Sequence, residues 1–106
     1  MANFLVIASY SSDGIKGVVK NGGTARAAAV KKAVEGLGGT MHSFHFAFGD
    51  ADAYVQVEVP DNIAAAALGL AVCSTGLVST KTVVLLTPAE MDQAARLQVA
   101  YTPPGG

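Results

Sequence analysis

The chain has 106 residues, of which 51% are hydrophobic and 14% charged, and its net charge is -1. This length predicts one domain, and the scattered charges exclude the basic stripe of a nucleic-acid-binding protein and the polybasic run of a membrane-surface protein. Soluble domains are usually about 25% charged, so the low charge predicts that self-association covers apolar surface.

The single cysteine, Cys73, excludes an intrachain disulfide and a cysteine metal cluster, which fits a reducing compartment. The first residues lack the positive charge of a signal peptide, and the longest apolar stretch, residues 63–73, is too short to span a bilayer. We therefore expect a cytoplasmic protein with no membrane partner.

The first half of the chain predicts a strand and two helical segments. Residues 3–10 are apolar and rich in β-branched side chains, and the turn-forming residues 11–14 follow, so we expect a buried strand. Residues 15–20 predict a single helical turn, which Asn21-Gly22-Gly23 interrupts. The segment 24–37 is the clearest helix.

That helix has its apolar side chains on one face. Val30, Val34 and Leu37 follow one another at i, i+4 and i+7, as on the buried face of an amphipathic helix. Two glycines then end the helix, as glycine does beyond a C-cap.

A hairpin occupies the centre of the chain. Residues 40–48 and 53–59 alternate in polarity with the period of a strand, and the loop 49–52 joins them. Pairing Phe48 with Ala53 across this loop predicts cross-strand partners whose numbers sum to 101.

In this register His45 lies opposite Gln56, Ser43 opposite Glu58 and Ala47 opposite Tyr54. The alternation of polarity then assigns the two faces of the sheet. The Phe and Val side chains of the hairpin form the face that packs under the helices. The other face is open in a lone protomer; it carries Ser43, His45, Tyr54, Gln56 and Glu58.

The second half predicts an apolar helix over residues 63–74 and a strand over residues 77–86. Thr87-Pro88-Ala89-Glu90 has the composition of a capping box with proline at the first helical position, so a short helix should run to about residue 98. We expect one domain over residues 1–98 and a loose tail over residues 99–106. The order strand, helix, strand, strand, helix, strand predicts a ferredoxin-like α+β fold, with four antiparallel strands and two helices on one face.

An open sheet face on an apolar chain predicts a homodimer formed sheet to sheet, with a pocket between the sheets. His45 should point into this pocket, where a histidine near a carboxylate or phenol is a common general acid or base. Glu58 and Tyr54 would assist it, and Ser43 and Gln56 would bind substrate. The alternative is a histidine hydrogen-bonded to Gln56 or to the partner chain.

Tyr10 and Lys81 are further candidate substrate-binding residues. Tyr10 lines either the pocket or the interface, and Lys81 either protects a sheet edge or points into the cavity. Asn21-Gly22-Gly23-Thr24, with Arg26 nearby, either holds an anion on free helix amides or is a flexible connector, because it lacks the glycine spacing of a phosphate loop.

No metal or other cofactor is expected. His42 and His45 have odd spacing, so on a strand they point to opposite faces, and a joint site would need a bulge or another chain. Asp50 and Asp52 are typical hairpin-loop residues, whose side chains bond to nearby backbone amides.

Several segments resemble those of the GYD-domain family, over nearly the whole chain. They are Ala8-Ser9-Tyr10, Asp13-Gly14-Ile15, Glu35-Gly36-Leu37-Gly38-Gly39, Ser43-Phe44, Phe48-Gly49-Asp50-Ala51-Asp52, Val57-Glu58-Val59-Pro60-Asp61 and Thr87-Pro88-Ala89-Glu90-Met91. In the family's signature Gly, a variable residue, Tyr and Asp occupy the hairpin, and this chain has Ala51 in place of the tyrosine.

The resemblance implies a ferredoxin-like fold of the dimeric α/β-barrel kind, and the general function of the family is not established. Our first hypothesis is a homo-oligomer that binds a small, largely apolar organic molecule on the open sheet face, with cofactor-free acid-base catalysis if it is an enzyme. The alternatives are a non-catalytic assembly or ligand-sensing module and, third, a haem or metal protein.

Overall fold

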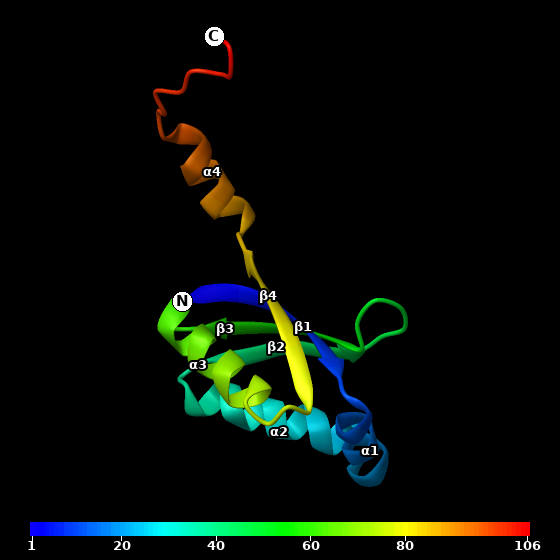
Figure 1. Ribbon diagram of the computed structural model, residues 1–106. Helices are drawn as coiled ribbons and strands as arrows, with labels where there is room; N and C mark the ends of the chain where they lie inside the picture. Colours follow the sequence, from blue (N-terminus) through cyan, green and yellow to red (C-terminus); the bar gives the residue numbers. More distant parts are fainter.

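The computed structural model describes all residues, 1–106. Its elements in chain order are β1 (Ala2–Tyr10), α1 (Ser12–Asn21), α2 (Gly23–Gly36), β2 (Thr40–Phe46), β3 (Ala53–Val59), α3 (Asn62–Cys73), β4 (Val78–Leu85) and α4 (Pro88–Arg96). The strands form one antiparallel sheet in the order β2-β3-β1-β4, and α2 and α3 lie on the same side of it (Figure 1). The predicted ferredoxin-like α+β fold is confirmed.

Alternation along β3 separates the two faces of the sheet. Val55, Val57 and Val59 are each less than 5% exposed and pack with Phe4, Val34 and Leu68 in the main core. The residues between them, Tyr54, Gln56 and Glu58, are half-buried and point to the side without helices. The core therefore lies between the sheet and the helices, as the sequence predicts.

The segment expected to form a single helical turn is a full helix, α1. Ser11 caps it by accepting a hydrogen bond from the Gly14 backbone N–H, and Asp13 adds an acidic side chain to the first turn. Gly22, with a φ angle of 91°, separates α1 from α2 in a conformation that glycine adopts readily. The prediction made this helix too short because it began at residue 15, four residues after the N-cap Ser11.

The predicted hairpin register is wrong by two residues. Phe46, not Phe48, lies opposite Ala53, so His45 faces Tyr54 and Ser43 faces Gln56. The loop is longer than expected because Asp52 is bound to the neighbouring strand: its backbone N–H donates to the Ala8 carbonyl at 2.9 Å. A shift by an even number of residues leaves the side chains of residues 43–46 on their predicted faces.

The chain ends in an arm that leaves the body. α4 and the tail project away from the sheet (Figure 1), and α4 buries no residue. The radius of gyration is 16.9 Å, whereas a compact domain of this size has about 13 Å. The predicted capping box is present, since Thr87 accepts from the Glu90 N–H and the Glu90 carboxylate accepts from the Thr87 N–H.

Two glycines of α1 provide a test of this packing. A Cβ at Gly14 would overlap the Leu77 backbone carbonyl, whereas a Cβ at Gly17 meets nothing within 4 Å. We expect Gly14→Ala to lower the free energy of unfolding by about 1–3 kcal/mol, as overpacking does. Gly17→Ala should raise it by about 0.5–1 kcal/mol through helix propensity. Urea denaturation measures both, and equal effects would contradict the close approach of α1 to Leu77, the residue before β4.

The capping box predicts a pH dependence for α4. The Thr87 backbone N–H, followed by the Thr87 hydroxyl, lowers the pKa of Glu90 below its ordinary value. Because the folded-state pKa is the lower one, the carboxylate stabilises the helix above the unfolded pKa, and this contribution is lost as the pH falls through the folded value. NMR shifts of residues 88–96 should show α4 fraying in that range, and Glu90→Gln should flatten the response.

Candidate functional site

Cross-strand pairing places most of the predicted site residues in rows on the open face of the sheet. One row runs His45, Tyr54, Ile7, Lys81, and the next runs Ser43, Gln56, Leu5, Val83. A third row runs Thr40, Glu58, Asn3, Leu85. Six of the seven candidate residues therefore share one face, and their functional roles stay predictions.

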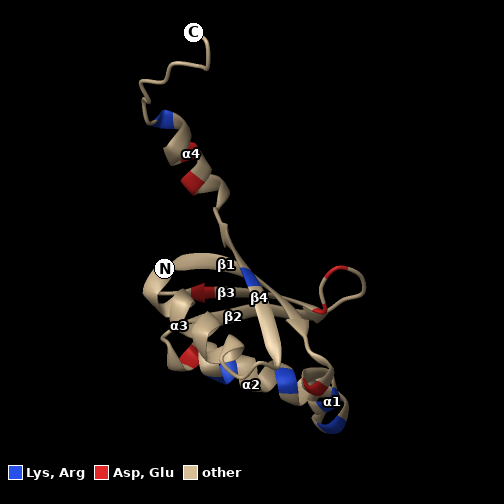
Figure 2. Ribbon diagram, viewed as in Figure 1, with Lys and Arg blue, Asp and Glu red and all other residues tan.

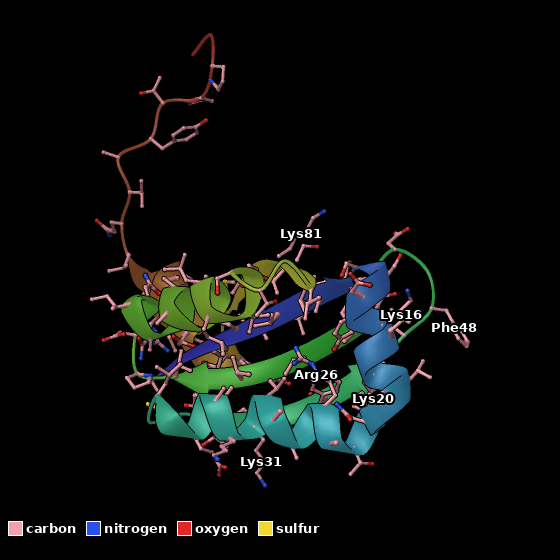
Figure 3. The ribbon with its side chains drawn as sticks, turned by 60° about the horizontal axis from the view of Figure 1, so that its bottom comes forward. Lys16, Lys20, Arg26, Lys31, Phe48 and Lys81 are labelled. Atoms are coloured by element: carbon pink, nitrogen blue, oxygen red, sulfur yellow. The ribbon has the colours of Figure 1, made fainter.

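Lys81 lies on the edge strand and on the open face, and its predicted place in a cavity stays a prediction. β4 is an edge strand, so an exposed lysine protects that edge from pairing with another chain. Lys81 also belongs to the open face, in the same row as His45, and it extends away from the body in Figure 3.

Glu58 is hydrogen-bonded to His42 and does not contact His45, which it was expected to assist. The register shifts between Met41 and Ser43, which makes His42 the extra residue of a bulge. The bulge brings His42 Nε2 to 3.0 Å from Glu58 Oε1, so the expectation that His42 points away from this face is wrong. No three His, Cys, Asp or Glu side chains lie together as a metal site requires.

His45 itself is exposed and has no oriented hydrogen-bond partner. No hydrogen bond joins it to Tyr54, which faces it, or to Gln56, its predicted partner. The predicted pairing of His45 with Gln56 followed from the incorrect register. The face thus carries an imidazole and a phenol side by side, without a third group that orients them.

Tyr10 lies on the other side of the sheet. It pairs with Val78 and alternates in phase with Phe4 and Ala8, so it faces the helices rather than the open face. The same alternation is visible in the sequence and would have assigned it correctly. Its hydroxyl accepts a hydrogen bond from Arg26 Nε at 3.1 Å.

A groove of about 450 Å³ crosses the helix layer. α1 and α2 form one wall, mostly through glycine and alanine, and α3 forms the other wall. Tyr10, Arg26, Leu68 and Val72 line it and also line a small inner cavity of about 30 Å³ that lies against the sheet. The walls of the inner cavity are mostly apolar, with Val30, Phe44, Val55 and Val57 among them.

Arg26 is the cation of this groove. It lies over the sheet between α2 and α3, whereas Lys16, Lys20 and Lys31 point outward (Figure 3). Charged residues are sparse throughout the chain, and α3 has none (Figure 2). Among the lysines and arginines, Lys16 forms an ion pair, with Asp13, and Glu58 is hydrogen-bonded to His42, so no carboxylate neutralises Arg26.

A family model for the GYD domain matches residues 4–95 of the chain. The chain belongs to the GYD domain family. The resemblance seen in the sequence is thereby confirmed over most of its length. A search of curated proteins and a search of solved structures found no match.

In this GYD domain the signature hairpin is structural. The Asp52 carboxylate accepts the Tyr10 backbone N–H at 2.8 Å, which ties the loop to the end of β1. Ala51, at the position of the signature tyrosine, is buried. The hairpin therefore contributes to the groove indirectly, by fixing the strand end that carries Tyr10.

None of the four helices of the GYD domain combines the length and the apolar character needed to cross a bilayer.

The two loop aspartates give a matched test of this anchoring. Asp52→Ala removes the acceptor of the Tyr10 N–H, and a hydrogen bond to a charged group contributes about 1.5–3 kcal/mol. Asp50 is exposed and makes no side-chain hydrogen bond, so Asp50→Ala should change the free energy of unfolding by less than about 0.5 kcal/mol. Chemical denaturation compares the two variants, and equal stabilities would contradict the structural role of Asp52.

Proposed function

We propose that this GYD domain is a homodimer that binds a small, largely apolar organic molecule in the helix-side groove. The groove carries this proposal, because its volume of about 450 Å³ lies in the range of small-molecule sites and its lining is apolar with few polar groups. It is formed within one chain. A pocket on the open face, as expected from the sequence, would need a second chain to enclose it.

Binding stands ahead of catalysis in this proposal. A side-chain acid or base is ordinarily held in position by a hydrogen-bonding neighbour. His45 has no such neighbour, and the carboxylate expected to assist it is bound to His42. A ligand-binding or sensing role needs no such group.

The open face supports the dimer. Leu5 and Ile7 of β1 lie beside Val83 and Lys81 of β4, and Val83 is 43% exposed. In the whole chain, 11 of 106 residues are buried, so a lone protomer leaves much apolar surface in water. A second copy placed on this face would cover it.

The charges of the open face favour a second copy over an unrelated partner. Lys81 lies beside Ile7 on one side of β1, and Glu58 lies beside Asn3 on the other side. Leu5 is midway between these positions. A two-fold axis through Leu5, perpendicular to the line from Lys81 to Glu58, brings each lysine opposite the glutamate of the other copy.

The C-terminal arm points to the same assembly. α4 has 9 residues and none is buried, and a free helix this short is marginal in water. Its side chain Met91 and the flanking Leu86 and Leu97 are all more than half exposed. Packing of the arm against the second copy would bury them and stabilise the helix.

Charge reversal tests the dimer and its orientation. We expect native mass spectrometry and light scattering to show a dimer, and Lys81→Glu or Glu58→Lys to weaken it by about tenfold. The double variant Lys81→Glu/Glu58→Lys should restore it, whereas Lys31→Glu, on the outer side of α2, should have no effect. A monomeric wild-type protein would contradict the dimer, and a dimer that tolerates both reversals would contradict the orientation.

Neighbouring alanines of α2 test the groove. Ala29 lines it, and Ala28, which is also exposed, does not. Titration with 1-hexanol, followed by amide NMR shifts, should move groove signals from α2 and α3 in a saturable manner. Ala29→Phe should abolish these shifts by filling the groove, and Ala28→Phe should keep them. Binding that survives Ala29→Phe would place the ligand elsewhere.

A further inference from the structure

We infer that the molecule bound in the groove carries a carboxylate, and that Arg26 is the residue that binds it. This inference rests on the proposed function and adds the chemical class of the ligand. Arg26 is the single charged residue among all those that line the groove and its inner cavity. Arg26 is half-buried in a hollow with few polar groups, and the chain supplies no carboxylate to pair with it, so its charge is available to an anion from outside.

The guanidinium is held ready for such an anion. Its Nε donates to the Tyr10 hydroxyl at 3.1 Å, and its Cζ lies 5.5 Å from the centre of the Tyr10 ring. One of its five N–H donors is thereby used, and both terminal nitrogens remain available. Their planar geometry matches the two oxygens of a carboxylate, which can accept two parallel hydrogen bonds.

Tyr10 acts as a positioning residue for Arg26. Its backbone is fixed by the Asp52 carboxylate, and its side chain then fixes the guanidinium. The Tyr10 hydroxyl accepts from Arg26, so its own hydrogen is free to donate to a ligand oxygen.

The surroundings favour a carboxylate over a phosphate. A single arginine balances one negative charge, whereas a phosphate monoester carries about -1.5 to -2 near neutral pH. No second cation lines the groove. The inner cavity, with Val30, Phe44 and Leu68 in its wall, is suited to the apolar end of the same molecule. The ligand class is therefore a small aliphatic or aromatic carboxylic acid.

Matched acids and alcohols test the inference. The probes are butanoate, hexanoate and octanoate with the corresponding primary alcohols, titrated into the full-length protein and followed by amide NMR shifts. We expect the best acid to bind about tenfold or more tightly than its alcohol, as a charge-assisted hydrogen bond provides. Arg26→Gln should reduce the acid to the affinity of the alcohol and leave the alcohol unchanged.

Three further variants separate charge from positioning. Arg26→Lys keeps the charge without the planar donors, so we expect it to retain part of the preference for the acid. Tyr10→Phe removes the hydroxyl and should weaken the acid and not the alcohol. Lys31→Gln, on the outer face of α2, should change neither affinity. Unchanged alcohol binding also shows that each variant is folded.

The outcomes separate the two proposals. If acids and alcohols bind equally and Arg26→Gln affects neither, the carboxylate inference is overturned while the groove keeps its function. If no acid and no alcohol moves the groove signals at millimolar concentration, both proposals are overturned. A preference for acids that persists in Arg26→Gln would assign the anion to another group and also overturn the inference.

Discussion

The hydrogen bond between the Tyr10 backbone N–H and the Asp52 carboxylate is the constraint on which the rest of the site depends. It joins the loop of the central hairpin to the end of the central strand β1, at 2.8 Å. The neighbouring bond from the Asp52 N–H to the Ala8 carbonyl fixes the same junction from the backbone side. Because both bonds are long-range in sequence, they set the hairpin register and the position of Tyr10 together.

Features of this molecule that depend on residues close together in the sequence can be predicted, and features that depend on distant residues cannot. The capping box at Thr87 and the alternation along β3 depend on neighbours in the chain, and both are correctly predicted. The hairpin register depends on contacts between Asp52 and β1, and the bulge at His42 interrupts an alternation that looks regular. Neither the register nor the bulge can be recognised from the residues next to it in the sequence. The assignment of faces survived for residues 43–46 because the register error there is even, and it failed at the bulge.

The groove illustrates the same limit for the site. Its walls come from α1, α2 and α3, and Tyr10 of β1 and Val78 of β4 also line it, so it exists only where these separate segments meet. The sequence did associate Arg26 with an anion, through the Asn21-Gly22-Gly23-Thr24 connector, but without the cavity. Asn21 and Gly22 also line the groove, so part of the connector belongs to its wall.

One strand therefore serves both faces of this GYD domain. Along β1, the residues that alternate with Phe4, Ala8 and Tyr10 reach the core and the groove, and those that alternate with Leu5 and Ile7 reach the open face. The alternation of side chains along a strand gives each face of the sheet its own composition. In this way one strand contributes both to the core with its groove and to the open face. An uncompensated arginine is notable against that background. The other residues that line the helix side of the groove are uncharged, so the proposed recognition of a carboxylate would give Arg26 a role that packing alone does not require.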